Sequence, residues 1–476
     1  MRRLITLCLV VCAALLVLAG PVTRGFELDA VQAQQQQPPP PQQQRQPEEI
    51  DITLNNPATH PKLGLSGFAT PAGDAELAEA ARTLADVLWA DLDFEREYQM
   101  ISRKASAALP LVTTADAVPV AQWRELGADA VMIGSLRRSG QNFTVELKVI
   151  AVRGVATGQQ AFGSTYDNCT VRNPRLCAHS IADNFHKITR GLDGVARTKL
   201  AFSSDRDGTK MANRPMVNPG VGKEIYVADY DGANQRRFTV NQSLNVGSAW
   251  APSGGLLAYV SWASTVPDIY IASVAEAGRA VTRPANAGLN VQNWHPAWSP
   301  DGNRLAFASN RTGNLDIWVV NRDGSGLTNL TPNSSSSEGK PSWSPDGRQI
   351  AFTSDRQGNN QIFVMGADGQ GRQVIVAQRS DSPTWSALGF IAFALESPGG
   401  QDIALFDWQT RQVTVLTDGK GRNSSPAISP SGRHIAFITS RWGGDQIAVI
   451  DRRGENVRRI TTAGNNTWPS WQPISR

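Results

Sequence analysis

The sequence has few of the residues that build metal clusters and disulfide frameworks. Its 476 residues include only 5 histidines and 4 cysteines, too few for a multi-metal protein or a disulfide-rich scaffold. Lysine plus arginine (46) nearly balances aspartate plus glutamate (42), and no basic block exceeds two residues, so nothing predicts a nucleic-acid footprint. Glycine (42) and proline (28) are plentiful, and 18% of residues are charged. This composition predicts a folded, turn-rich protein of two or three domains.

The motifs of common catalytic sites are also missing. There is no Gly-x-Ser-x-Gly elbow, no His-Glu-x-x-His pair and no phosphate-binding loop, the local signatures of hydrolases, zinc peptidases and nucleotide enzymes. His179 and His186 fall on one expected helix face, but no third ligand is near in sequence, so packing is favoured over a metal. Residues 205–208 faintly resemble a calcium loop, and an ordinary turn is the favoured interpretation. We therefore expect no enzyme activity, no metal and no cofactor.

An export signal occupies the N-terminus. Two arginines precede an apolar run over residues 4–19, the pattern of a secretory signal peptide. The run is shorter than the roughly twenty residues that a membrane span needs. Cleavage after Ala33, with Val31 at the −3 place, is preferred over cleavage after Ala19. The predicted signal peptide therefore comprises residues 1–33.

A Gln/Pro-rich tether follows at residues 34–48. It cannot bury apolar surface, and its prolines favour an extended polyproline-type spacer. The alternative is a flexible arm that a partner captures as an added strand or short helix.

The mature chain keeps two cysteines, Cys169 and Cys177. In an oxidising compartment, cysteines that close so short a loop are expected to pair, which stabilises the fold by about 2–3 kcal/mol. A redox role would favour a Cys-x-x-Cys spacing, which is absent.

Residues 49–196 predict a small α/β domain. Apolar residues at helical spacing predict a long helix over residues 75–92 and a short one over 120–126. Residues 130–135 read as a buried strand, and 143–152 with 161–166 as a hairpin. A last helix is expected over 173–188, with Asn173 as its N-cap and proline in the first turn.

The second half of the chain repeats itself. Trp-Ser-Pro-Asp-Gly at residues 298–302 recurs at 343–347, and degenerate copies at 42- to 48-residue intervals begin at residues 250, 385, 428 and 471. An apolar run, a glycine turn, a second apolar run, an Asp-Gly turn and a last short strand follow most copies. Four short strands in such an interval are typical of a β-propeller blade.

Six such runs predict a six-bladed β-propeller over residues 197–476. The last copy, residues 468–471, has no blade of its own, so we expect it to pair with the strand that begins near Leu200. That pairing would close the ring and remove two free sheet edges. The predicted fold class is thus α+β: a small α/β domain followed by a propeller that the C-terminal strand closes.

The repeat resembles that of the TolB propeller family. The shared elements are the Trp-Ser-Pro-Asp-Gly turn, the Ile-Ala-Phe-x-Ser strand and the x-Ile-x-Val-x-x-x-Asp-Gly segment. Residues 178–183 (Ala-His-Ser-Ile-Ala-Asp), 188–191 and 197–202 resemble that family's junction between its α/β domain and its propeller. The resemblance runs from about residue 49 to the C-terminus. The Gln/Pro tether and the cysteine pair depart from the family pattern, and the arm that contacts TolA is not recognisable.

The resemblance implies a non-enzymatic periplasmic member of the Tol-Pal system. It implies that the propeller binds the peptidoglycan-associated lipoprotein Pal and that the N-terminal region communicates with inner-membrane TolA. Such a scaffold supports outer-membrane integrity and cell division. We expect a monomer that binds no nucleic acid and does not insert into the membrane after signal cleavage.

A second class of function stays open, a secreted propeller that binds or processes a periplasmic glycan or peptide. A carbohydrate lyase on this scaffold would gather several histidines or acidic residues at one mouth. The propeller offers only His295 and His434, which makes the enzymatic version the weaker one.

The partner site is predicted at one mouth of the propeller channel. In each copy the residues just before the Pro-x-Trp step lead into the strand expected nearest the channel. Small polar groups around aromatic anchors are typical of a protein-binding surface, although the tryptophans could instead pack between blades. The predicted residues are Asn245, Gly247, Ser248, Asn293, Trp294, His295, Glu338, Gly339, Lys340, Asp381, Ser382, Ser424, Ser425, Asn466, Thr467 and Trp468.

Overall fold

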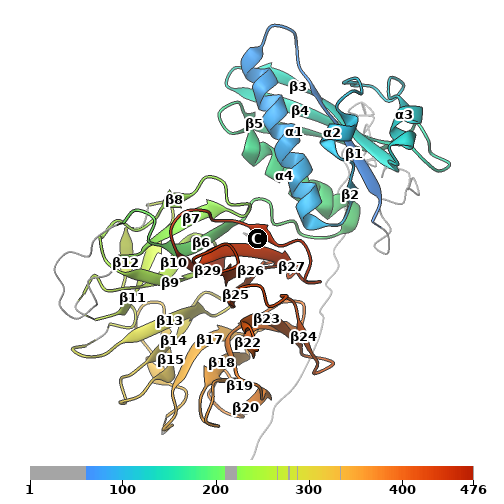
Figure 1. Cartoon of the computed structure of the whole chain (residues 1–476). Coiled ribbons are helices and arrows are strands. Elements are labelled where there is room, and N and C mark those ends of the chain that lie inside the picture. The colour runs from blue at the N-terminus through green and yellow to red at the C-terminus, as the bar shows by residue number, and fades with distance from the viewer. Residues whose placement is uncertain are drawn as a thin grey trace, which may run out of the picture. The chain divides into compact units, whose positions relative to one another are not determined.

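An α/β domain opens the part of the chain that the computed structural model describes, which comprises residues 60–208, 222–264, 266–276, 279–286, 288–332 and 334–474. The predicted signal peptide and tether lie outside these residues. The domain contains a five-stranded sheet in the order β2-β1-β3-β4-β5 (Figure 1). β1 is parallel to β2 and β3, whereas β3, β4 and β5 are antiparallel. The strands are β1 (Lys62–Ala69), β2 (Gln99–Met100), β3 (Ala130–Ser139), β4 (Asn142–Ala151) and β5 (Gln160–Thr170), and the helices are α1 (Ala75–Glu95), α2 (Arg103–Ser106), α3 (Val120–Glu125) and α4 (Pro174–Arg190).

Side-chain alternation along β3 divides this domain into two cores. Met132 faces the larger core, to which α1 and α4 contribute, whereas Val131 and Ile133 face a smaller cluster around Trp123 of α3. Successive residues of a strand point to opposite faces of the sheet, so β3 serves both cores. The four side chains are fully buried.

The elements predicted for this domain are confirmed, with three omissions, which are β1, β2 and α2. Both long helices begin at the expected residues, and the Asn173 side chain accepts a hydrogen bond from the Leu176 N–H at 3.2 Å. Asn173 is therefore the N-cap and Pro174 the first residue of α4. The predicted hairpin is β4–β5. β1 was not predicted, because its Lys-Leu-Gly-Leu-Ser-Gly-Phe-Ala sequence lacks a run of β-branched residues.

The described residues of the second half form six four-stranded antiparallel sheets, the six predicted blades (Figure 1). The first strand of each blade below lies nearest the channel, and we call it the inner strand. Blades 1 to 3 are β29 (Asn466–Trp471), β6 (Lys199–Ser204), β7 (Glu224–Asp229), β8 (Arg236–Arg237); β9 (Asn245–Trp250), β10 (Leu256–Ser261), β11 (Asp268–Ser273), β12 (Ala280–Thr282); and β13 (Asn293–Trp298), β14 (Arg304–Ser309), β15 (Asp316–Asn321), β16 (Thr328–Asn329). Blades 4 to 6 are β17 (Glu338–Trp343), β18 (Gln349–Ser354), β19 (Gln361–Gly366), β20 (Gln373–Val376); β21 (Ser380–Trp385), β22 (Phe390–Ser397), β23 (Gly400–Asp407), β24 (Val413–Val415); and β25 (Asn423–Ile428), β26 (His434–Thr439), β27 (Gln446–Asp451), β28 (Arg458–Arg459).

The C-terminal strand closes the ring as predicted. β29 pairs antiparallel with β6, with Trp471 opposite Leu200 and Asn466 opposite Ser204. The first blade is therefore assembled from both ends of the propeller sequence, and this pairing removes two exposed edges.

The repeated tryptophan ties blades 2, 3 and 4 each to the blade before it. The indole N–H of Trp298 donates to the carbonyl of Ala249, and that of Trp343 to the carbonyl of Ala297, each at 3.2 Å. Trp250 donates in the same way across the closed seam, to the carbonyl of Ser470. The tryptophan of the motif thus fills the space between sheets and also satisfies a backbone acceptor there.

Candidate functional site

Each inner strand contains a β-bulge near its start. Pairing with the second strand loses register there in all six blades, and one residue per blade has a positive φ of 49–62°. A left-handed backbone costs a non-glycine residue about 1–2 kcal/mol, and a bulge re-aims its side chain. The fold therefore repeats one strained geometry six times, at Gly247, His295, Lys340, Ser382, Ser425 and Trp468.

These six bulge residues line a single cavity of about 120 Å³. Five of them precede a proline that also lines the cavity, and Ser248 takes that place in blade 2. We call this cavity and its lining the channel mouth. Residues that are far apart in sequence, from all six blades, meet here because the repeat places the same bulge in each inner strand.

Other residues of the predicted set are fully buried and join neighbouring blades. Asn245 and Asn293 each begin an inner strand and donate from their side-chain amides to Glu224 at 2.9 Å and Asp268 at 2.8 Å. Asn466 bonds Gln446 in the same way at 3.2 Å. These side chains do not line the channel mouth, so the structure corrects their prediction as rim residues and gives them a role in holding blades together.

Glu338 belongs to the same buried class. It is fully buried, and its carboxylate accepts hydrogen bonds from Arg356 at 2.8 Å, Ser334 at 2.7 Å and Ser354 at 3.2 Å. Burial raises the pKa of Glu338, although these partners oppose the shift. Its carboxylate binds these partners in and next to blade 4 and is not exposed to solvent.

An ion pair joins blades 4 and 5 at the mouth. The Lys340 ammonium binds the Asp381 carboxylate, which also accepts from the Thr353 hydroxyl at 3.0 Å and from the Ser382 backbone N–H at 2.8 Å. Both ionic side chains are partly exposed. The pair therefore links two predicted site residues and is partly reachable from solvent.

The remaining predicted residues flank the bulge residues. Gly339 faces the His295 ring, since a Cβ built on it would lie 3.8 Å from Nδ1. Thr467 accepts a hydrogen bond from Lys223 at 3.2 Å. Ser424 is partly buried beside its bulge residue.

Aromatic side chains surround the blade 1 to blade 3 side of the mouth. Trp294 packs edge-on against Trp262, with ring centroids 4.9 Å apart. These two rings, Trp468 and Leu244 are partly buried against one apolar cluster of blades 2 and 3. We call Trp262, Trp294 and Trp468 the tryptophan shelf. Trp262 and Leu244 were missed, because each lies one residue outside a repeat element, and only the pairing of strands reveals that they flank the mouth.

The mouth is close to electrically neutral. Burial, helped by the positive charge of Lys340, lowers the pKa of His295 to about 4, so its imidazole is neutral at pH 7. Lys340 and Asp381 compensate one another. Two buried atoms of the lining, Nδ1 of His295 and Oγ of Ser248, have no hydrogen-bond partner among the described residues. The site thus offers apolar rings and unsatisfied polar atoms, which suits binding of a partly polar surface.

The two helical histidines bond groups of the protein itself. His179 Nδ1 lies 2.8 Å from Asp91, whereas His186 Nδ1 lies 2.9 Å from the carbonyl of Ala182 one turn earlier. Within the residues described above, no group of three or more His, Cys, Asp or Glu could hold a metal ion. Asp205 closes an ordinary turn, since its carbonyl accepts from the Gly208 N–H at 2.9 Å.

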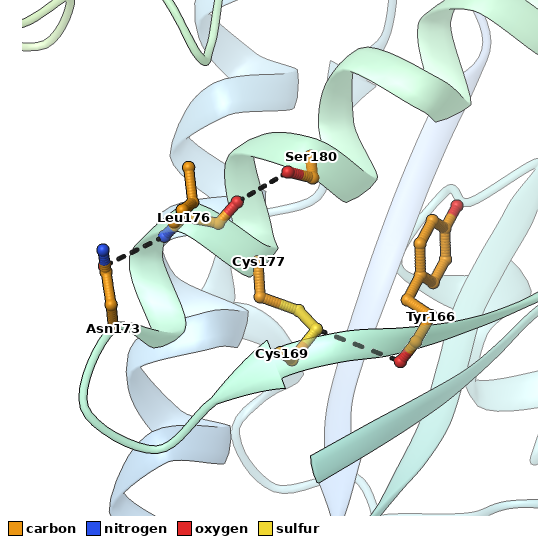
Figure 2. Close-up of a disulfide and its surroundings, with 6 residues drawn as sticks. All are labelled: Tyr166, Cys169, Asn173, Leu176, Cys177 and Ser180. Atoms are coloured by element: carbon orange, nitrogen blue, oxygen red, sulfur yellow. Dashed lines mark hydrogen bonds between the residues drawn. A yellow bond between two sulfur atoms is a disulfide. The ribbon is translucent and has the colours of Figure 1, made fainter. Parts of the chain in front are cut away.

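The cysteines meet in the α/β domain. Figure 2 shows Cys169, near the end of β5, bonded to Cys177 in the first turns of α4. Their Cα atoms are 5.2 Å apart and both residues are buried. The disulfide pins the edge strand to the helix that follows it.

None of the described helices is both long and apolar enough to cross a membrane.

Comparison with known proteins identifies relatives of both parts of the chain. The family model of the TolB amino-terminal domain matches residues 49–160, and that of the TolB beta propeller domain matches residues 185–475. The Tol-Pal system protein TolB of Francisella tularensis subsp. mediasiatica is 30% identical over 367 residues, which cover 74% of this chain and 80% of that protein. The Desulfosudis oleivorans protein of the same name is 30% identical over 284 residues, 59% of this chain and 60% of the relative. The crystal structure of TolB from Acinetobacter baumannii shares the fold, with a TM-score of 0.71 and 20% identity over 88% of this chain and 98% of that one.

Proposed function

The chain belongs to the TolB family, and from this premise we propose that it is a periplasmic scaffold of the Tol-Pal system whose channel mouth binds a Pal-like, peptidoglycan-associated lipoprotein. It works by binding and catalyses no reaction. Through this contact it supports outer-membrane integrity and cell division.

The observation that carries the proposal is the repeated bulge. One residue from each blade accepts left-handed backbone geometry and lines the same cavity. Strain that recurs at a solvent-accessible site is a reason to infer function there, because an ordinary strand start would hold the blades without it.

The chemistry of the mouth suits a protein partner. The tryptophan shelf supplies apolar anchors, and the Lys340–Asp381 pair and the serines supply a polar rim. Interface hot spots are enriched in tryptophan and lie within polar surroundings that exclude water. Since the mouth carries little net charge, we expect affinity to depend on shape and hydrogen bonding more than on salt.

The link to TolA is the second half of the proposal. It rests on family membership, and the N-terminal region assigned to it lies outside the described residues. Binding of TolA by the mature chain, and loss of that binding when residues 34–59 are deleted, would support it. Retained binding after the deletion would contradict it.

A glycan- or peptide-binding propeller is the alternative, and the tryptophan shelf favours it to the extent that sugar rings also pack on indoles. A catalytic version loses support from the position of His434. That side chain is 2% exposed and packs against Phe94 of the α/β domain, which leaves His295 alone at the mouth.

The test is a binding titration between the mature protein and the peptidoglycan-associated lipoprotein of the same organism. Lys340→Ala and Trp468→Ala should each weaken binding by more than about 1 kcal/mol while melting is unchanged. Leu327→Ala is the control: Leu327 is 37% exposed in the turn between β15 and β16, at the opposite end of blade 3 from His295. Full affinity in both mouth variants would contradict the proposed site, and turnover of a periplasmic oligosaccharide would favour the alternative.

A further inference from the structure

Phe94, in the last turn of α1, is an anchor between the α/β domain and two blades. Its ring stacks on that of His434 in blade 6, with centroids 4.2 Å apart and planes 20° apart. It also meets Tyr230 of blade 1 edge-on at 4.8 Å, and the Arg458 guanidinium lies 4.9 Å from its centroid. These contacts lie at the ends of the blades opposite the channel mouth, because the strand register pairs His434 with Asp451 and the inner-strand residue Asn423 with the far end of β26.

The contact with blade 6 buries the His434 imidazole against Phe94. Nε2 of His434 lies 3.1 Å from the backbone carbonyl of Phe94, so Nε2 carries the proton and donates. Nδ1 is then an acceptor, and it is buried without a partner among the described residues. A second proton would have to enter at this buried atom.

The Glu95 carboxylate also belongs to the blade 6 contact, and both of its oxygens accept hydrogen bonds. Glu95 Oε2 accepts from Arg433 Nη2 at 2.6 Å and Nε at 3.1 Å, and Oε1 accepts from the Val195 N–H at 2.9 Å. Glu95 is 4% exposed. Both oxygens of Glu95 are therefore engaged by Arg433 and the Val195 N–H, and neither forms a hydrogen bond with His434.

The contact with blade 1 contains a second histidine, His179, whose surroundings favour the protonated ring. The Tyr230 hydroxyl donates to Asp91 Oδ1 at 2.6 Å, while Asp91 Oδ2 lies 2.8 Å from His179 Nδ1. Arg175 binds Asp231, next to Tyr230, at 2.5 Å. Here the Asp91 carboxylate bonds the histidine ring directly, so the negative charge of Asp91 balances a positive charge on His179. The second proton of His179 would enter at Nε2, which is buried without a partner among the described residues.

The surroundings shift the pKa values of the two histidines in opposite directions. Burial, with Arg433 in addition, lowers the pKa of His434, and Glu95, Asp451 and the Phe94 carbonyl oppose the shift without reversing it. Arg458 also faces this contact.

For His179 the balance is reversed. Burial lowers the pKa of His179, but the hydrogen bond and charge of Asp91 outweigh it and the net pKa is raised. Asp231 adds to the rise and Arg175 opposes it.

We propose that the blade 6 contact is a proton-operated release: it holds the α/β domain while His434 is neutral and opens when His434 gains a proton, whereas the blade 1 contact stays closed. The sign follows from linkage. A base whose pKa is depressed in the closed state favours closure above its open-state pKa and loses it as the pH falls. His179 has the raised value, so its cluster keeps its stability on acidification. Acid therefore releases the His434 contact and leaves the blade 1 contact as a pivot.

Hydrogen exchange of the mature protein, measured at pH 7.5 and pH 5.0 and corrected for the intrinsic rate, tests this directly. With an ordinary histidine pKa of 6.5 in the open state, opening of residues 92–97 should rise by up to about 30-fold at pH 5.0. Protection of residues 226–231 should not change. His434→Gln keeps an N–H donor for the Phe94 carbonyl but cannot be protonated. In this variant, residues 92–97 should therefore exchange as slowly at pH 5.0 as at pH 7.5.

His295→Gln is the matched control, since it removes a buried propeller histidine far from the joint and should keep the wild-type response of residues 92–97. Unchanged exchange of the wild type at pH 5.0 would overturn the proposal, as would a full acid response in His434→Gln. Fast exchange of that variant at both pH values would also overturn it, because the ring rather than its charge would then hold the joint. If residues 226–231 lost protection together with residues 92–97 at pH 5.0, the pivot on blade 1 would be contradicted.

Discussion

Single residues at the channel mouth hold a backbone conformation that side chains disfavour. Ser425 has a φ of 50°, and the equivalent residues of the other five blades have φ values of 49–62°. The proline that follows most of these residues fixes where the bulge ends. The position in the repeat therefore sets the backbone conformation. The side chain differs from blade to blade and is available for binding.

That separation predicts a steric penalty for branched residues at the bulge. Ser425→Val should lower the free energy of unfolding by about 1–2 kcal/mol, because a β-branched side chain tolerates positive φ poorly. Thr414→Val, on the exposed edge strand β24, should change it by less than about 0.5 kcal/mol. Denaturant titration measures both, and equal stability of the two variants would show that the bulge carries no strain.

The disulfide is the second prediction at this scale. Replacing Cys169 and Cys177 together by serine should lower the free energy of unfolding by about 2–3 kcal/mol through the loss of a short closed loop. Mass spectrometry of the wild-type peptides should show a two-dalton increase on reduction. Alkylatable thiols in protein purified from the periplasm would contradict the pairing.

At the scale of the element, the indole-to-carbonyl bond is the repeated tie between blades. Trp298→Phe keeps most of the apolar ring but removes the donor to Ala249, so we expect a loss of about 1 kcal/mol in the free energy of unfolding. Trp385 shows no such bond among the described residues and packs on Trp408 at 5.0 Å, so Trp385→Phe should cost less. Thermal or denaturant unfolding compares them, and an equal loss in both would assign the effect to ring size alone.

Elements also show what the sequence could and could not reveal. Repeat spacing predicted all six blades and the inner-strand position of the mouth residues, because turn chemistry and apolar alternation are local. It could not distinguish Asn293, which is buried against blade 2, from His295 two residues later, because a bulge changes the alternation of faces. Trp262 was missed for the related reason that its neighbours come from another blade.

At the scale of the whole molecule, closure by β29 makes the propeller depend on both ends of its sequence. Deleting residues 467–476 should leave β6 unpaired on one side and cause aggregation or a clearly lower melting temperature. Deleting the tether, residues 34–48, should leave melting unchanged and serves as the control. A soluble truncated monomer with the wild-type melting temperature would contradict the closure.

The anchoring of α1 on blades 1 and 6 could not be predicted from sequence. Helical periodicity predicted α1 and its apolar face, yet Asp91, Phe94 and Glu95 bind residues more than 130 positions away. Nothing in a repeat of about 45 residues indicates which turns meet a preceding domain.

Docking of the partner at the channel mouth can be tested by site-specific photo-crosslinking in living cells. A photoreactive amino acid at position 424, beside the bulge residue of blade 6, should form an adduct with the peptidoglycan-associated lipoprotein. The same amino acid at position 327, at the opposite end of blade 3, should form none. An adduct at 327 without one at 424 would contradict docking at the channel mouth.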